Sequence, residues 1–355
     1  MAKETDASLS EYSASSIPAE AESVEGIIDY LSWHQRPPCL YFYDWPAAHS
    51  GVPLAHFVGE QVELTLEEIE VCTGCGEAAP SSPCGECGRE PPFANCVTQP
   101  AQDCTYNTCP FETFKNRNCS EQFAVYLAVS DRVKVGISRA KRLQTRWREQ
   151  GATHAICIAL VPNRFEAGLV EAAISEAREE MTAVLETRML SQSRQTWTTP
   201  LSAPVETLTD AVVLAGDYFP QGAQEWYQFP DRDRSRIENA VRRIRGLSTG
   251  GKDDEFPHSL LGSLSHLLEG ESVTSRFIGV RGQLLVTEDG FVNCNTHGGH
   301  RIRIKTTAPH TEYITDVESP PSAVSSETDW SRVHSSERPT RPDESADKAN
   351  ASDFM

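Results

Sequence analysis

Lysine is scarce in this chain of 355 residues: only seven of its 32 basic residues are Lys, against 51 acidic residues, and the formal net charge is −19. The sequence also lacks the run of about 20 apolar residues that a membrane-spanning helix needs. Its first residues have no basic head followed by an apolar stretch, which does not fit a secretory signal. We therefore expect a cytoplasmic protein with no membrane partner, whose 39% apolar content builds two or three small cores.

The negative charge is concentrated at the two ends of the chain. Residues 1–25 carry a net −5 and residues 311–355 a net −6, which leaves −8 for residues 26–310. Both ends are rich in small and acidic residues, so we interpret them as disordered acidic tails. An acidic, lysine-poor chain also suits a salt-rich, halophile-like cytoplasm. The charge argues against a protein that coats nucleic acid, although it is compatible with a local basic site.

Eight of the eleven cysteines fall in one block, which we place at residues 72–122. Without a secretion signal, metal binding explains such a block better than disulfides do. The first four form two Cys-x-x-Cys pairs, and each pair places two thiolates on one tight turn. This spacing predicts a closed, structural zinc site; the alternative is a set of reduced structural or redox cysteines. The four residues are Cys72, Cys75, Cys84 and Cys87.

The other four cysteines of the block have looser spacing and predict a second closed zinc site. The alternative is that some of them are small buried side chains. They are Cys96, Cys104, Cys109 and Cys119. The three cysteines outside the block stand in apolar or strand-like surroundings, and we expect them to fill cores: Cys39, Cys157 and Cys294.

Residues 124–138 alternate apolar and other side chains in two halves, which predicts a β-hairpin with a loop at residues 130–132. In this register the opposite face carries Tyr126 across from Gly136, and Lys134 nearby. One face then carries three apolar cross-strand pairs: Val125–Ile137, Leu127–Val135 and Val129–Val133.

A helix is expected next, over residues 138–151, with Ser138 as its cap, Leu143 and Trp147 on its core side and Gly151 at its end. Residues 154–161 then predict a strand. Asn163, followed by a glutamate three positions later, predicts the start of a helix that extends to about residue 190.

Seven basic residues and no acid lie between positions 132 and 148 of this negative chain. One interpretation is a solvated helix face, and the other is a surface that binds anions such as nucleic acid. The seven residues are Arg132, Lys134, Arg139, Lys141, Arg142, Arg146 and Arg148.

The cysteine block, followed by the stretches VYLA, KVGISR, RW, QGA and AGLVE, resembles an uncharacterised prokaryotic family, the domain-of-unknown-function family numbered twenty-seven ninety-seven. The resemblance covers roughly residues 50–200. The segment from residue 279 to residue 304 also looks like the closing segment of that family.

The hairpin–helix–strand–helix unit in turn resembles a GIY-YIG nuclease domain. Residues 124–126 stand where GIY falls, and residues 134–136 stand where YIG falls, with Lys134 in place of the second tyrosine. The resemblance implies that Tyr126 activates water, that Arg146 steadies the phosphate and that Glu171 holds Mg²⁺ or Mn²⁺. Phosphodiester cleavage needs these three contributions.

The remaining segments predict short strands at residues 39–71 and a three-stranded meander at residues 277–305, and we expect the two regions to pair into one β unit. Arg301, Arg303 and Lys305 would give its last strand a basic face. His297 and His300 flank a glycine turn; metal ligation is one interpretation, and surface histidines at a turn are the one we favour. Residues 193–270 contain short helical pieces, at 234–246 and 260–270, and no motif.

We therefore predict an α/β (α+β) protein with a small GIY-YIG-like sheet and flanking helices, preceded by a zinc module, plus a small β unit from the N- and C-terminal segments. The leading hypothesis is a nucleic-acid-binding protein that cleaves with a divalent metal. A non-catalytic zinc module that binds RNA, DNA or a ribonucleoprotein, and a protein-interaction scaffold, remain alternatives. The expected segments are 1–25, 26–71, 72–122, 123–192, 193–270, 271–310 and 311–355.

Overall fold

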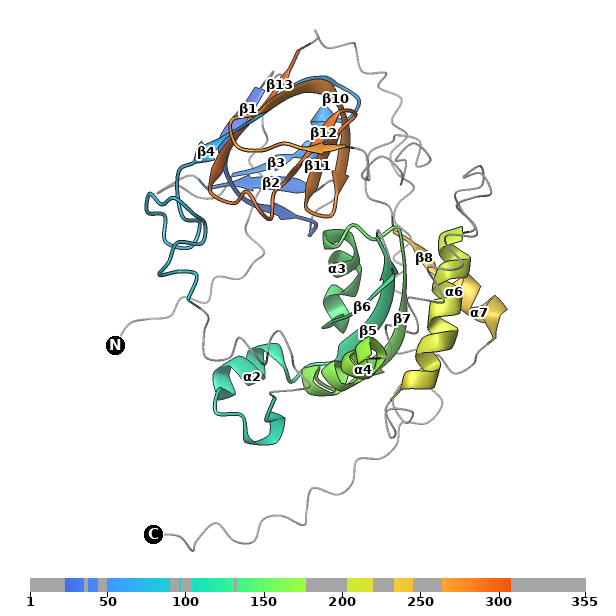
Figure 1. Ribbon diagram of the computed structural model, residues 1–355. Coiled ribbons are helices and arrows are strands. Elements are labelled where there is room, and N and C mark those ends of the chain that lie inside the picture. The colour runs from blue at the N-terminus through green and yellow to red at the C-terminus, as the bar shows by residue number, and fades with distance from the viewer. Residues whose placement is uncertain are drawn as a thin grey trace, which may run out of the picture. The chain divides into compact units, whose positions relative to one another are not determined.

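A computed structural model describes most of the chain between residues 23 and 307 and shows a mixed α/β protein with two sheets (Figure 1). Both expected tails lie outside the described residues, except that the first strand already begins at Ser23. None of the described helices is long and apolar enough to span a membrane. The described residues are 23–34, 38–43, 50–89, 96, 104–130, 133–176, 203–219, 233–244 and 264–307.

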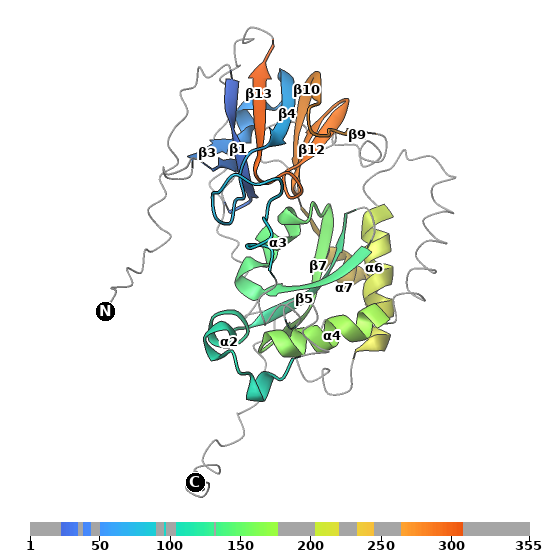
Figure 2. The ribbon, with the colours of Figure 1, turned by 60° about the vertical axis from the view of Figure 1, so that its left-hand side comes forward.

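The larger sheet has the strand order β3-β2-β1-β13-β4-β10-β11-β12-β9. N-terminal and C-terminal segments therefore pair, as predicted, because β4 lies between β13 and β10 (Figure 2). The strands are β1 (Ser23–Ser32), β2 (Cys39–Phe42), β3 (Ser50–Pro53), β4 (Gln61–Ile69), β9 (Ser265–His266), β10 (Ser272–Arg281), β11 (Leu284–Thr287), β12 (Gly290–Asn293) and β13 (His300–Thr306).

The prediction of a three-stranded meander at residues 277–305 was wrong in its first and last strands: residues 277–286, expected as one strand, form the hairpin of β10 and β11 around Gly282, and the last strand pairs elsewhere. β13 pairs with β1 and β4 rather than with β12. The reason is length: β12 has 4 residues, whereas β1 has 10 and β4 has 9, so the two longer strands satisfy far more of the backbone groups of β13.

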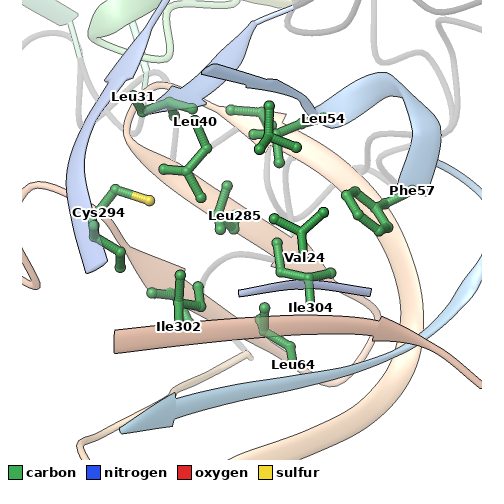
Figure 3. Packing of buried hydrophobic residues seen from close by; sticks show 14 of the residues in the cluster. Val24, Leu31, Leu40, Leu54, Phe57, Leu64, Leu285, Cys294, Ile302 and Ile304 are labelled. Atoms are coloured by element: carbon green, nitrogen blue, oxygen red, sulfur yellow. The ribbon is translucent and has the colours of Figure 1, made fainter. Parts of the chain in front are cut away.

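The core of this sheet is built by alternation along its strands. Val62, Leu64 and Leu66 on β4 are fully buried, and Ile302 and Ile304 on β13 point to the same side. Figure 3 shows Leu64, Ile302 and Ile304 beside labelled side chains of β1, β2 and β11. Cys294 belongs to this core and Cys39 is also buried, as predicted.

The outer face of β13 is not a free basic surface, which corrects the expectation from its sequence. The Arg301 Nε lies 2.5 Å from Glu70 Oε1, and the Arg303 Nε lies 2.8 Å from Glu25 Oε2. Glu67 contacts Arg303 at 3.0 Å. The sequence of β13 shows the cations but not the acids that its neighbouring strands place across from them.

We expect this ion-pair network to make a small contribution to stability that is lost in acid. The hydrogen bond from Arg301 holds the pKa of Glu70 below its ordinary value. Such a group stabilises the fold above its unfolded pKa, about 4.3, and stops doing so as the pH falls through its folded pKa. Glu70→Gln should therefore lower the urea midpoint at pH 7 and have no effect at about pH 2, where Glu70 itself is protonated. The control is Glu68→Gln, an exposed residue of β4 two positions before Glu70. Equal losses in both variants would contradict the role of the network.

The smaller sheet has the order β6-β5-β7-β8, with every pair antiparallel. The predicted hairpin register is confirmed at all the paired positions, including Tyr126 opposite Gly136. Val125 and Leu127 pack with apolar residues of α4 and α6, so these helices cover that face of the sheet. The strands are β5 (Phe123–Val129), β6 (Val133–Arg139), β7 (His154–Val161) and β8 (Arg242–Arg243), and the helices are α2 (Glu112–Asn118), α3 (Leu143–Glu149), α4 (Arg164–Glu176), α6 (Ala203–Ala215) and α7 (Arg234–Ala240).

Helix boundaries follow the predictions in part. Gly151 ends α3 with a φ of 66°, and Asn163 Oδ1 accepts the Glu166 backbone N–H at 2.9 Å, as expected of a cap. Ser138 is not a cap, because β6 continues to Arg139 and a 3-10 turn precedes α3. The helix predicted over 260–270 was also wrong for its described residues: β9 pairs with β12 there, which overrides the local helical pattern.

Candidate functional site

The first cysteine set forms a compact cluster directly after β4. The four sulfur atoms all lie within 4.8 Å of one another, and Cys75 Sγ is 3.8 Å from Cys84 Sγ. Tetrahedral zinc, with bonds of about 2.3 Å to sulfur, separates its ligands by about 3.8 Å. The cluster therefore suits structural zinc, as the spacing predicts, and a closed four-sulfur shell leaves no position for a substrate.

Two matching turns build the cluster. In each, a glycine that follows the second cysteine donates its N–H to the carbonyl of the first: Gly76 to Cys72, and Gly88 to Cys84, both at 2.7 Å. Gly76 has a φ of 78°, a conformation that other residues rarely adopt. The sequence Cys-x-x-Cys-Gly thus provides both the thiols and the turn that aims them.

The electrostatics of the cluster also favour a cation. The Cys84 N–H donates to Cys72 Sγ at 3.2 Å and lowers the pKa of Cys72 to about 6. Hydrogen bonds with its neighbouring thiols raise the pKa of Cys87 to about 12, because a thiolate there would face other sulfur atoms. Four thiolates at this spacing repel one another, and a bound Zn²⁺ removes that repulsion.

Gly299 attaches the cysteine turns to the larger sheet. Its carbonyl accepts the N–H groups of Glu70 at 2.9 Å and of Val71 at 3.4 Å, and its own N–H donates to Ile28 at 2.8 Å. Its φ is 86°, and a Cβ at this position would lie 2.1 Å from the Val71 carbonyl oxygen. The chain just before Cys72 is therefore fixed by a contact that only glycine permits.

The thiols of the second cysteine set influence one another but do not form a compact cluster like that of the first set. Burial raises the pKa of Cys104, and the charges of Cys96, Cys119 and Cys109 raise it further, so the four thiols are near enough to interact. Among the described residues, however, only the first set brings its ligand atoms within 4.8 Å of one another. A second zinc site at Cys96, Cys104, Cys109 and Cys119 stays a prediction.

A tyrosine site lies on the other face of the smaller sheet. Tyr126 is 1% exposed, and its hydroxyl donates to Gln150 Oε1 at 2.7 Å. Its ring packs edge-on against Trp147, with 6.1 Å between centroids. A Cβ on Gly136 would lie 2.7 Å from the Tyr126 hydroxyl, so the glycine makes room for the phenol.

The charges of two other predicted residues act on Tyr126. Burial raises the pKa of Tyr126 to about 12, the hydrogen bond and charge of Arg146 oppose that rise, and the Glu171 carboxylate adds to it. Burial also raises the pKa of Glu171, against the effect of Arg164 and Arg146. Tyr126 on β5, Arg146 on α3 and Glu171 on α4 therefore belong to one electrostatic group. Lys134 lies on β6, opposite Ala128.

The basic window is partly compensated by two acids that flank it in the sequence. Glu121 contacts Arg139 and Lys141, each at 2.7 Å. Glu149 contacts Arg142 at 2.9 Å and Arg146 at 3.5 Å. Arg142 and Arg146 are still nearly half exposed, so both remain accessible to an anion. Arg148 also lies on α3, and Arg132 lies outside the described residues.

A comparison with known protein families identifies the family of this chain. The model of a family described as a protein of unknown function (DUF2797) matches residues 59–302, well over half of the sequence. The chain belongs to the DUF2797 family. No curated protein and no solved structure matches it. The DUF2797 match includes the whole cysteine block and the tyrosine site, so one family segment contains both.

One residue of the tyrosine site escaped the sequence analysis. Gln150 accepts the phenol proton, and it lies four positions after Arg146, on the same side of that helical turn. This spacing is the signal that could have identified it, once Tyr126 and Arg146 were paired. Its role is to hold the phenol in position.

Proposed function

We propose that the protein binds nucleic acid and cleaves a phosphodiester bond with a divalent metal, at a GIY-YIG-like site formed by Tyr126, Arg146 and Glu171. The observation that carries the proposal is that α3 packs on the buried ring of Tyr126 through Trp147, where the charges of Arg146 on α3 and Glu171 on α4 both act on the phenol. The order hairpin, α3, β7, α4 and the confirmed register of Tyr126 opposite Gly136 also support it. The zinc cluster has a structural part in this proposal.

Each side chain suits a separate role. Arg146 is nearly half exposed and can reach a phosphate from solvent. A partly buried carboxylate with a raised pKa, such as Glu171, is stabilised by a divalent cation such as Mg²⁺ or Mn²⁺. Tyr126 keeps its proton at neutral pH and donates it to Gln150, so it would orient the attacking water by accepting a hydrogen bond from it. The exposed Lys141 and Arg142 would contact the flanking backbone, with Arg139 and Arg148 beside them.

The test is cleavage of labelled single- and double-stranded DNA and RNA with Mg²⁺ or Mn²⁺. Glu171→Gln should lower the rate by at least about 100-fold, because a catalytic metal contributes several kcal/mol of charge stabilisation. The matched control is Glu166→Gln, on the same helix but outside the tyrosine site, which should keep most of the activity. Equal rates in the two variants would overturn the assignment of Glu171.

A second candidate, binding without cleavage, is favoured by the burial of Tyr126, which at 1% exposure is closed to water. It predicts affinity for nucleic acid that falls with salt and no metal-dependent cleavage. Arg142→Glu and Arg146→Glu should each weaken binding and reduce the slope of log K against log salt by about 1. If the native protein has no affinity for any of the four nucleic acids, both candidates fail and a protein-interaction scaffold remains.

A further inference from the structure

Three histidines from two distant parts of the sequence meet at the edge of the larger sheet. His266 is on β9, His297 is in the loop after β12, and His300 begins β13. The rings of His266 and His297 lie 5.1 Å apart, and those of His297 and His300 lie 4.8 Å apart in a T-shaped contact. The Glu269 carboxylate is 3.9 Å from His300 Nε2, at the exposed rim of this group.

The separation of two ring nitrogens matches a metal site. The Nε2 atoms of His266 and His297 are 3.2 Å apart. Two imidazoles bound to one tetrahedral zinc, with bonds of about 2.0 Å, place their nitrogens about 3.3 Å apart. A direct N–H···N hydrogen bond spans a similar distance, so the separation alone does not decide between the two.

The protonation state of His297 is the one that a metal requires. His297 is 9% exposed, and its Nδ1, like the Nδ1 of His300, is buried with no hydrogen-bond partner within the described residues. Burial lowers the pKa of His297 to about 4, with the charges of His300 and His266 acting in the same direction. Its imidazole is therefore neutral at pH 7, the form that binds metals. Among the described residues no acceptor fixes the tautomer at these Nδ1 atoms, so the neutral ring of His297 can carry its proton on Nδ1 and present the Nε2 lone pair to a metal.

We propose that His266 and His297 hold a divalent transition metal, such as zinc, with a third ligand from His300 or Glu269. The third ligand needs a side-chain rotation, because among the described residues only the four cysteines already bring three or more ligand atoms together. Glu269 is 48% exposed on the turn that follows β9, which leaves its carboxylate free to turn. Imidazole and carboxylate ligands together favour zinc and its neighbours over Mg²⁺ or Ca²⁺.

The metal would fasten a weak edge of the sheet. β9 has 2 residues and pairs with β12 through a short parallel ladder. Apart from this ladder, the stacking of His266 on Phe291, the burial of Leu267 and the backbone hydrogen bond from Gly270 to the Leu66 carbonyl hold the segment in place. A metal bound by both His266 and His297 would link this segment, through coordination bonds, to the loop that leads into β13. The site differs from the cysteine cluster in ligand chemistry and does not depend on the proposed nuclease function.

The test uses the full-length, untagged protein with its cysteine site loaded, titrated with Zn²⁺ and analysed for metal after dialysis. The native protein should retain about one zinc more per chain than His266→Asn or His297→Asn. Hydrogen exchange of residues 264–271 should slow on adding Zn²⁺ to the native protein but not to either variant. The control, His56→Asn, removes an exposed histidine outside the group and should behave as the native protein does.

The absorption spectrum with Co²⁺ and a folding check of the variants complete the test of the histidine site. Co²⁺ at this site should add visible absorption without the near-ultraviolet charge-transfer band that thiolate ligands give. Circular dichroism shows whether each variant is folded, and His266→Asn, which removes the less buried ring, is the milder change. Equal zinc content and equal exchange in His266→Asn and His56→Asn would overturn the proposal and leave a hydrogen-bonded histidine pair.

Discussion

Replacing Cys75 by serine is expected to release the zinc and to unfold the two cysteine turns. Cys75 is exposed, so its substitution does not disturb an apolar core, and the effect reports on ligation. The apparent binding free energy of a structural Cys-rich zinc site is about 10–16 kcal/mol, and it also stabilises the folded loop. Loss of a direct ligand should weaken binding by more than the roughly 10–100-fold that loss of a surrounding hydrogen-bond partner causes.

The measurement is zinc per chain after dialysis, together with limited proteolysis of residues 72–88. The matched control is Ser81→Ala, in the loop between the two turns, which removes a hydrogen bond to the Pro83 carbonyl and leaves all four sulfurs in place. Cys87→Ser should repeat the result of Cys75→Ser. If Cys75→Ser retains zinc as tightly as Ser81→Ala does, the cluster is not a zinc site.

Gly299→Ala is expected to destabilise the fold strongly. The added Cβ would lie 2.1 Å from the Val71 carbonyl oxygen, and the residue has a φ of 86°. A left-handed conformation costs a non-glycine residue about 1–2 kcal/mol, and overpacking a tight site costs about 1–3 kcal/mol more. We therefore expect the free energy of unfolding to fall by about 2–5 kcal/mol, with lower zinc affinity because Val71 precedes Cys72.

The neighbouring glycine provides the control. A Cβ on Gly298 would meet Asp29 O and Thr73 Cγ2 at 3.9 Å, which is ordinary van der Waals contact. Gly298→Ala should leave the urea midpoint nearly unchanged. Equal shifts for the two alanine variants would show that neither the φ of Gly299 nor its contact with Val71 matters.

Local signals in the sequence predicted much of the smaller sheet. The alternation from Val125 to Ile137 fixed the hairpin register, because a slip by one residue would turn every apolar side chain to the wrong face. Asn163 and Gly151 marked helix ends through backbone chemistry confined to a few residues. The position of β13 was not predictable in this way, because it depends on which distant strands compete for its backbone groups.

The candidate sites divide in the same way, into those formed by residues close in the sequence and those formed by distant residues. The two Cys-x-x-Cys turns are local, so their spacing was enough to predict the first cluster. The ion pairs of Arg301 and Arg303, and the contact of His266 with His297, join residues far apart in the chain. No pattern in a single segment could reveal those partners, and His297 therefore looked like a surface histidine.

The position of β13 also has a consequence for how the protein is made. Ser23 on β1 pairs with Lys305 on β13, and β4 meets the same strand on its other side. At about 5–20 residues per second, the ribosome needs roughly 15–60 seconds to reach β13 after it has completed β1. The smaller sheet, apart from β8, lies within residues 123–161 and can fold during that interval. Until β13 is synthesised, β1 and β4 each have one edge without its final partner strand. The middle of the larger sheet is therefore its last part to be assembled. Translation products that end before β13 would expose these unpaired strand edges and become substrates for chaperones.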